Sequence, residues 1–424
     1  MHAAFRRRLR AVPFAVLAAC VAPGSVHTQG AARDPRLAAA LDTIRAGNEW
    51  TLTQQASICE IPAPPFKERA RAREFQKRLE AWGLANVRID AEGNVIGERR
   101  GTGSGPVVVL SGHLDTVFPE GTDVRVRRDG DMMRGPGIGD DCRGLAVILA
   151  VARAFERANV RTPGTIYFVG TVGEEGPGNL RGVRHLLGKE LAGRVNYFIS
   201  VDGTGFGITS RAVGSHRYRV VFSGPGGHSY GHFGIPNPIH ALGRAIAGIA
   251  ELQVPTAPRT TFSVGIIEGG TSVNSIAAEA SFDVDLRSES AEALNTVDAA
   301  FRRTVQSALA AENARWPAAA ERYRLTVRID TVGIRPAGAQ PDTARIVRVA
   351  QQAARALRID APPPNASSTD SNYPISVGIP AITIDGGGRG RGAHSLEESY
   401  EDGPDGYRGP QWAALVAAML AGGG

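Results

Sequence analysis

The segment GPGIGDDCRGLAVILAVARAF, residues 135–155, joins a glycine-rich loop to an apolar helix. The helix is predicted because residues such as Leu145 and Ile148 recur at helical spacing. The loop before it places two acids, Asp140 and Asp141, next to each other. Gly and Asp are the residues that turns use most, so the loop alone is compatible with an ordinary surface turn. A metal site is the alternative interpretation. The residues that follow the other predicted strands decide between the two.

Four short apolar runs alternate with helical segments along the chain. They are residues 106–110, 165–172, 195–201 and 380–384. Near-continuous apolar runs are typical of strands buried on both faces in a mostly parallel sheet with helices on each side. The sequence therefore predicts an α/β fold. Ahead of this pattern, residues 34–82 predict two helices separated by the loop CEIPAPP, and residues 86–101 predict a hairpin around Glu92-Gly93.

Residues 213–333 follow a different pattern, with predicted elements in the order β-α-β-β-α-β. This is the order of the ferredoxin-like unit. It predicts a second domain inserted into the first, whose two parts are residues 30–212 and 334–424.

The N-terminal segment predicts export. Four arginines within residues 6–10 precede an apolar stretch of about a dozen residues, the layout of a secretory signal over residues 1–29 rather than a membrane span. A short buried helix is the alternative. LAAC, which ends in Cys20, resembles the lipobox of bacterial lipoproteins, so two outcomes remain open: a lipid anchor at Cys20, or cleavage near HTQGAARD. The expected location is periplasmic or secreted, with membrane contact only through such an anchor.

Net charge and cysteine content argue against two classes of protein. The net charge is +6, and only +2 without those four arginines, which argues against a nucleic-acid-binding surface. After the signal, only Cys59 and Cys142 remain, too few for a disulfide framework. For Cys59 we expect a buried apolar role, while a single bridge stays open.

Acidic and histidine side chains follow each predicted core strand. In chain order they are His113 and Asp115, Glu174 and Glu175, Asp202, and His394. Ligands in open α/β sheets bind beyond the carboxyl ends of the strands, so we expect these loops and the Asp140-Asp141 loop to meet in one crevice. Imidazole and carboxylate both ligate zinc, and a bridging carboxylate permits two ions about 3.5–4 Å apart. The convergence favours a metal site over a turn.

The motifs SGHLDTV, GPGIGDD and GEEG together resemble those of the dinuclear-zinc exopeptidase and deacylase family that includes peptidase T, carboxypeptidase G and acetylornithine deacetylase. The resemblance covers nearly the whole chain after the signal. It implies two Zn²⁺ ions, with Co²⁺ or Mn²⁺ as other metals, and a cis peptide bond between Asp140 and Asp141. It also implies that the inserted domain is a dimerisation or lid domain, and hence a homodimer.

The resemblance implies roles residue by residue. It makes His113 a ligand of one ion and His394 of the other, Asp140 the bridge, and Glu175 and Asp202 the remaining ligands, one for each ion. Asp115 would orient His113 through its second ring nitrogen. Glu174 would be the general acid/base.

In the inserted domain, GPGGHS and the segment 269–288 also match the family. By resemblance His228, from the partner subunit, and Asn274 reach the substrate, and Arg287 holds a substrate carboxylate. The alternatives are a solvated loop for His228 and a surface charge for Arg287. Thr369 and Asp370 match an element near the site, for which a helix N-cap is an equal alternative.

Asp202 indicates the substrate class. In this family, aminopeptidases and dipeptidases usually have Asp at this position, whereas many carboxypeptidases and deacylases have Glu. We therefore expect a di- or tripeptide aminopeptidase, with an N-acyl-amino acid deacylase or carboxypeptidase as the alternative. A non-catalytic binding protein on the same scaffold is the alternative of another class, and it has no need to keep Glu174 beside a full ligand set.

Overall fold

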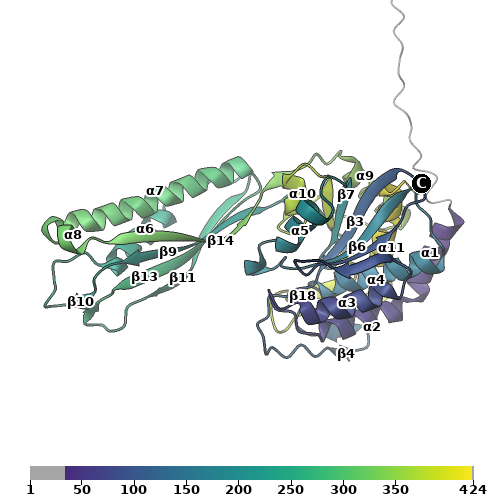
Figure 1. Cartoon of the computed structure of the whole chain (residues 1–424), viewed down its shortest axis with the longest axis horizontal. Helices are drawn as coiled ribbons and strands as arrows, with labels where there is room; N and C mark the ends of the chain where they lie inside the picture. The colour runs from purple at the N-terminus through teal and green to yellow at the C-terminus, as the bar shows by residue number, and fades with distance from the viewer. Residues whose placement is uncertain (1–33, 423–424) are drawn as a thin grey trace, which may run out of the picture.

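A nine-stranded sheet forms the centre of the larger of two lobes in the computed structural model, which describes residues 34–422 (Figure 1). Its strands run in the order β1-β2-β6-β3-β7-β17-β8-β15, with β16 also beside β8. The four middle strands β6, β3, β7 and β17 are parallel. The predicted α/β fold with a parallel core is confirmed. The bounds are β1 (Ala85–Ile89), β2 (Val95–Arg99), β3 (Gly105–His113), β6 (Gly164–Thr171), β7 (Tyr197–Val201), β8 (Ile208–Ala212), β15 (Gly338–Ala339), β16 (Asn365–Ser367) and β17 (Ala381–Ile384).

Alternating side chains of the parallel strands serve two separate cores. Val108 and Leu110 of β3 belong to a large cluster with the longer helices, whereas Val109 between them belongs to a smaller cluster on the other face. Successive side chains of a strand point to opposite faces, so only an apolar run can be buried on both. The helices of the large cluster are α1 (Pro35–Ala46), α2 (Asn48–Cys59), α3 (Arg69–Glu80), α4 (Cys142–Arg157), α9 (Arg345–Ala356) and α11 (Arg408–Leu420). Shorter turns cover the other face: α5 (Arg181–His185), η3 (Leu186–Glu190) and α10 (Asn372–Ser376).

The first predicted helix is divided in the structure. Three helices, not two, occupy residues 34–82, because Gly47 ends α1 and α2 begins at the next residue. Gly lowers helix stability by about 1 kcal/mol relative to Ala, and a Cβ at Gly47 would lie 2.5 Å from the Arg153 guanidinium. The sequence pattern carried no sign of this close approach.

The smaller lobe is the inserted unit, with a four-stranded antiparallel sheet in the order β11-β13-β9-β14. Figure 1 shows α6 and α7 along one face of this sheet. Its own core joins the sheet to both helices, and the rings of Tyr218 and Phe301 stack at 5.5 Å. The bounds are β9 (Gly214–Ser223), α6 (Pro238–Ala250), β11 (Thr260–Gly269), β13 (Glu279–Ser288), α7 (Ala291–Arg315), α8 (Pro317–Tyr323) and β14 (Thr326–Arg335), with short strands β10 (Gly227–His228) and β12 (Ser275–Ile276).

A second small sheet, which the sequence pattern did not predict, supports two loops of the site. It has the order β18-β19-β5-β4. Strand β5 leads into the loop that carries Asp140, and β18 leads into the loop that carries His394. The bounds are β4 (Arg127–Asp129), β5 (Met132–Arg134), β18 (Arg389–Arg391) and β19 (Ser399–Glu401), and the short turns η2 (Gly176–Gly178) and η4 (Gly403–Asp405) complete the elements.

The signal expected over residues 1–29, including Cys20, lies outside the described residues. Within residues 34–422, no helix combines the length and the apolar character that crossing a bilayer requires.

Gly164 marks a close approach between the first residues of β6 and β3. An added Cβ would lie 1.9 Å from the backbone oxygen of Pro106, whereas a Cβ at Gly103 would meet nothing within 4 Å. We predict that Gly164→Ala lowers the free energy of unfolding by about 1–3 kcal/mol, as overpacking does. Urea denaturation measures this, with Gly103→Ala as the matched control. Equal stability of the two variants would contradict the packing described for these strands.

Candidate metal centre

The carboxylate of Asp140 lies between two imidazoles. Its Oδ1 is 2.9 Å from Nε2 of His113, and its Oδ2 is 3.1 Å from Nε2 of His394. Each oxygen therefore faces a different histidine. A carboxylate placed in this way can bridge two cations, one on each side.

Each half of this arrangement contains one further carboxylate. Oε1 of Glu175 is 3.0 Å from Nε2 of His394, and Oδ1 of Asp202 is 4.0 Å from Nε2 of His113. The structure thus brings together all five predicted metal ligands, from the ends of β3, β6 and β7 and from two loops. His113, Asp140 and Glu175 offer ligand atoms that all lie within 4.8 Å of one another.

Asp141 holds the loop that carries Asp140 in place through two hydrogen bonds. Its side chain accepts from the backbone N–H of His113 at 2.8 Å and caps α4 by accepting from Gly144 at 3.0 Å. The peptide bond between Asp140 and Asp141 is cis, as the family resemblance implied. The second acid of the pair is therefore a structural residue that ties the loop to the end of β3.

Glu398 supports the same loop and was missed by the sequence analysis. Its buried carboxylate accepts from the backbone N–H groups of Gly137, Gly139 and Asp140 at 2.8–2.9 Å. Burial raises the pKa of Glu398 to about 7, although these three hydrogen bonds act to lower it. The only sequence signal was an acid four residues after His394, which alone has no specific meaning.

Asp115 holds a different position from the one expected. Nδ1 of His113 lies 3.0 Å from the backbone oxygen of Asp115 and 3.8 Å from its carboxylate, so the carbonyl is the partner of the ring. The carboxylate instead accepts from the backbone N–H groups of Glu174 and Glu175, at 3.1 and 2.7 Å. Two successive N–H groups at the end of β6 converge on it, so Asp115 positions the acid pair.

Glu174 is buried beside Arg335, another residue that the sequence analysis missed. Nη1 of Arg335 donates to Oε1 of Glu174 at 3.0 Å and to Oγ of Ser368 at 3.1 Å, and Nη2 contacts the Glu174 backbone oxygen. Burial raises the pKa of Glu174 to about 8, against the opposing effect of Arg335. Arg335 ends β14, where the chain returns from the inserted unit, so no local motif connected it to Glu174.

The charges of the cluster fit a cationic ligand. Burial would raise the pKa of Asp140, but hydrogen bonds from His113 and His394 outweigh it and hold that pKa well below its usual range. Hydrogen bonds to Asp140 and Glu175 raise the pKa of His394 to about 10, and burial together with Asp140 raises that of Asp202 well above its usual range. The crowded acids thus favour positive charge beside them, which divalent ions on the same atoms would supply.

A cleft of about 780 Å³ opens over these residues. Its lining includes Glu174 and Asp202 and three arginines, Arg217, Arg287 and Arg335. Arg287 donates to Asp285 at 2.6 Å, and Arg217 donates to the same carboxylate at 3.3 Å. The predicted substrate residue Arg287 is therefore in the cleft, together with two arginines that the sequence analysis did not single out.

His228 and Asn274 do not line this cleft. They lie together at the β10 and β12 pair, which Figure 1 places at the far end of the smaller lobe. His228 is exposed, and its Nδ1 accepts from the backbone N–H groups of Tyr230 and Gly231 at 3.3 Å. Within one chain these two residues are separate from the metal ligands.

Thr369 and Asp370 lie near the site, but neither is the N-cap of α10, which is Ser371. Thr369 lines the cleft, and its hydroxyl accepts from the backbone N–H of Ser371 just before α10. Asp370 is buried and accepts from Thr171.

Asp90, His185 and Glu190 form a second group of possible metal ligands among the described residues. Arg88 donates to Glu190 at 2.7 Å, and backbone N–H groups of the β1–β2 turn donate to Asp90. Both acids therefore already have hydrogen-bond partners within the protein.

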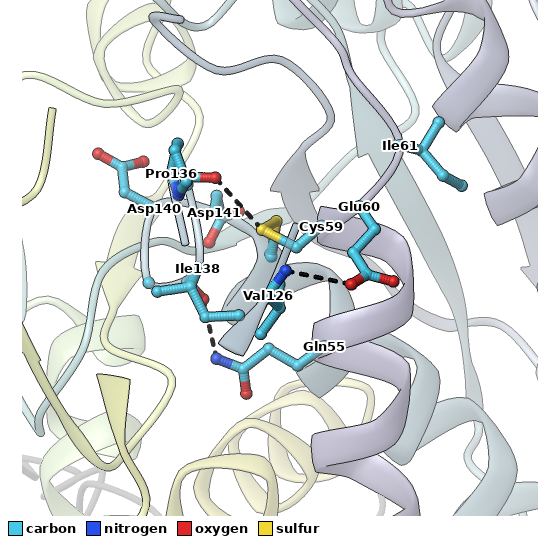
Figure 2. Close-up of a disulfide and its surroundings, with 12 residues drawn as sticks. Gln55, Cys59, Glu60, Ile61, Val126, Pro136, Ile138, Asp140 and Asp141 are labelled. Atoms are coloured by element: carbon cyan, nitrogen blue, oxygen red, sulfur yellow. Dashed lines mark hydrogen bonds between the residues drawn. A yellow bond between two sulfur atoms is a disulfide. The ribbon is translucent and has the colours of Figure 1, made fainter. Parts of the chain in front are cut away.

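Cys59 is fully buried, as expected, and it takes part in the single bridge that had stayed open. It forms a disulfide with Cys142, next to the Asp140-Asp141 pair (Figure 2). Both cysteines are fully buried, but spacing in sequence could not reveal that α2 ends against the start of α4.

Comparison with known proteins agrees with this geometry. Residues 109–415 match the model of peptidase family M20/M25/M40, which is most of the chain. The chain belongs to this family.

Curated relatives of the family differ in how much of their length the chain matches. The Bacillus subtilis protein YqjE is 27% identical over 341 residues, 78% of this chain and 84% of that protein. Carboxypeptidase G2 of Pseudomonas sp. is 30% identical over 202 residues, 46% of this chain and 47% of the enzyme. A match at 38% identity to a hydrolase of Pyrococcus abyssi covers 28% of this chain and only 32% of that protein.

Solved structures show the same fold. A tripeptidase from Staphylococcus aureus superposes with a TM-score of 0.71 at 21% identity, covering 88% of this chain and 98% of the tripeptidase. The Bacillus subtilis protein YXEP, described as a dinuclear metal binding peptidase, gives a TM-score of 0.66 at 18% identity over 89% and 99% of the two chains. As a member of the M20 family, the protein is a metallohydrolase, as predicted. The alternative of a non-catalytic binding protein is set aside.

Glu398 offers a test of how the Asp140 loop is held. In Glu398→Gln an amide N–H₂ replaces one oxygen that accepts backbone N–H groups, which leaves at least one of these donors unpaired. We predict that affinity for the more weakly held metal ion falls about 10- to 100-fold, as when outer partners of metal ligands are changed. Zinc titration against a chromophoric chelator measures this, with Glu397→Gln as the neighbouring control. Unchanged affinity in Glu398→Gln would show that the loop holds its shape without this carboxylate.

Proposed function

We propose that the protein is a zinc-dependent exopeptidase that removes the N-terminal residue from di- and tripeptides. The observation that carries the proposal is the position of Glu174, which is buried in a cleft that four of the five candidate metal ligands also line. A carboxyl group that is not itself a metal ligand can transfer protons at this place. A purely structural metal site would contain ligands alone and would need no such group.

The five ligands in this proposal are His113, Asp140, Glu175, Asp202 and His394. Zinc ions bound there would activate a water molecule and polarise the scissile carbonyl. Glu174 accepts the proton of the attacking water and returns it to the departing amine. Arg335 holds the Glu174 carboxylate in place through the hydrogen bond to Oε1.

The cleft also indicates how a peptide would be oriented. Arg217 and Arg287 share Asp285 as their carboxylate partner, so two cations face one acid at this side of the cleft. A substrate carboxylate placed there would gain charge-assisted hydrogen bonds. A short peptide suits this arrangement because its C-terminal carboxylate is only one or two residues from the bond to be cleaved.

A deacylase or carboxypeptidase of the same family is the second candidate. The three cleft arginines favour it as much as they favour a peptidase, because an N-acyl-amino acid also carries a free carboxylate. The similarity to carboxypeptidase G2 supports this candidate. Asp202 supports the aminopeptidase, because aminopeptidases and dipeptidases of the family usually have Asp at this position.

A matched substrate panel separates the two candidates. The zinc-loaded protein is assayed on dipeptides and tripeptides, on the same peptides with an acetylated amino terminus, and on N-acyl amino acids. We expect kcat/KM for free-amino peptides to exceed that of their acetylated forms by at least about tenfold, equivalent to 1.4 kcal/mol. A preference for acylated substrates would establish the deacylase or carboxypeptidase instead. Absence of hydrolysis on all three would contradict both.

Glu174 and Glu175 should fail differently when changed, although they are adjacent. Glu175→Ala removes a ligand oxygen and is expected to lower metal occupancy together with activity. Glu174→Ala is expected to keep both ions and still lose roughly 10²–10⁴-fold in kcat, the contribution of a positioned proton-transfer group. Metal analysis and peptide hydrolysis on both variants test this. Zinc loss in Glu174→Ala with full occupancy in Glu175→Ala would reverse the two assignments.

We also propose a homodimer in which His228 of each chain serves the site of the other. The support is that His228 and Asn274 match the family's substrate residues yet lie outside the cleft of their own chain. His228→Ala is expected to lower kcat/KM at least about tenfold, a typical loss for one hydrogen bond to substrate. His240→Ala, an exposed histidine of the same domain, is the control.

Mixed subunits test the shared site directly. The Glu174→Ala chain is expected to be nearly inactive and the His228→Ala chain to keep at most about a tenth of the wild-type kcat/KM, but a mixed dimer contains one site with both residues intact. Mixing and exchanging the two variants should restore activity toward one quarter of the wild-type value. A monomer in sedimentation, or no recovery on mixing, would contradict this proposal.

Export of the protein remains part of the proposal. The Cys59–Cys142 disulfide supports it, because disulfides persist mainly in oxidising compartments outside the cytosol. Mass analysis of the chain from cell fractions would identify the cleavage site and any lipid on Cys20.

A further inference from the structure

The disulfide lies at the base of the loop that presents Asp140. Cys142 follows the Asp140-Asp141 pair directly, and Cys59 is the last residue of α2. The two cysteines are 83 residues apart in sequence, and their Cα atoms are 5.4 Å apart. Figure 2 shows Cys59 between the helix and the loop residues Pro136, Asp140 and Asp141.

This loop, residues 135–141, takes most of its support from outside itself. It contains three glycines and no regular secondary structure. Gln55 of α2 donates to the backbone oxygen of Ile138 at 2.8 Å, and Sγ of Cys59 lies 3.5 Å from the backbone oxygen of Pro136. The C-terminal part of α2 therefore contacts the loop at two places, and a covalent bond joins it to Cys142, the residue that follows the loop (Figure 2).

The same end of α2 is also connected to the loop of His113. Arg71 is fully buried and donates to the backbone oxygen of Cys59 at 3.2 Å and to that of Leu114 at 2.9 Å. Leu114 follows His113 directly. A displacement of α2 relative to α4 would thus move the Asp140 loop relative to the histidine that must face it.

A covalent link has a specific value at this place. The hydrogen bonds of a glycine-rich loop each contribute little and can exchange with water, whereas a disulfide limits the separation of the two helix ends permanently. The carboxylate of Asp140 must satisfy two imidazoles from different loops, so a small shift of its loop disturbs both sides. Outer contacts of this kind determine how tightly a metal is held.

We propose that the Cys59–Cys142 disulfide is a positioning element of the metal centre, which holds the bridging carboxylate of Asp140 in the geometry for tight binding of both ions. This inference rests on the two-metal site of the proposed function. It concerns metal affinity, and not only the stability of the fold.

The test removes the bond without introducing charge or bulk. The variant Cys59→Ala/Cys142→Ala is compared with wild type by zinc titration against a chromophoric chelator. We expect at least one of the two zinc dissociation constants to rise about 10- to 100-fold, as for other partners of metal ligands. Circular dichroism of the variant should stay that of a folded chain.

A second variant separates positioning from general stability. Leu52→Ala truncates a buried side chain of the same helix α2, two turns before Cys59. It should lower the urea midpoint, as cavity-forming changes do, and keep both zinc dissociation constants within about twofold of wild type.

The outcomes are distinguishable. Equal zinc binding by wild type and the double alanine variant would overturn the proposal, as would equal loss of zinc in Leu52→Ala and the double variant. Peptide mapping without reductant should recover residues 59 and 142 in one linked fragment, and free thiols there would also overturn it. A wild-type chain that binds no divalent ion would instead contradict the proposed function, and the positioning role would fall with it.

Discussion

The contact on which the rest of the site depends is the carboxylate of Asp140 held between His113 and His394. These two histidines are 281 residues apart in the chain, and both must reach one short side chain. An aspartate has only two oxygens and one methylene, so its backbone has to be placed within a few tenths of an ångström. Many of the surrounding contacts keep the Asp140 backbone in this position.

The contacts that hold the Asp140 loop come from several segments of the larger lobe. Glu398 collects three N–H groups of the loop, Asp141 ties it to β3 and caps α4, and the disulfide fixes it to α2. Each of these partners is buried, where a hydrogen bond or ion pair is not exchanged for water. Arg335 extends the network to the inserted unit, because it ends the last strand of that unit and contacts Glu174. The position of Glu174 is thus connected to the lobe that carries the cleft arginines Arg217 and Arg287.

The sequence predicted the architecture well because its signals are local. Apolar runs that lack alternation indicate doubly covered strands, and β3, β6, β7 and β17 all lie within the predicted segments or extend them by a few residues. The five ligands could be selected because each follows one of these strands or opens a helix, and the carboxyl ends of parallel strands share one edge. What the sequence did not predict has a common origin: the division at Gly47, the contact of the Asp115 carboxylate with Glu174 and Glu175, and the disulfide all depend on contacts between segments distant in sequence.

The sequence by itself determined the fold class, the family and the five candidate metal ligands, because periodicity and motif order are properties of neighbouring residues. Only the tertiary structure decided which atoms those residues use. It assigned the Asp115 carboxylate to the backbone of Glu174 and Glu175, and it brought Glu398 and Arg335 to the centre from segments without a motif. It also joined Cys59 to Cys142 across 83 residues. The physical reason is that a hydrogen bond or a disulfide depends on distances of a few ångströms between side chains, and those distances are fixed by packing of the whole lobe rather than by spacing along the chain.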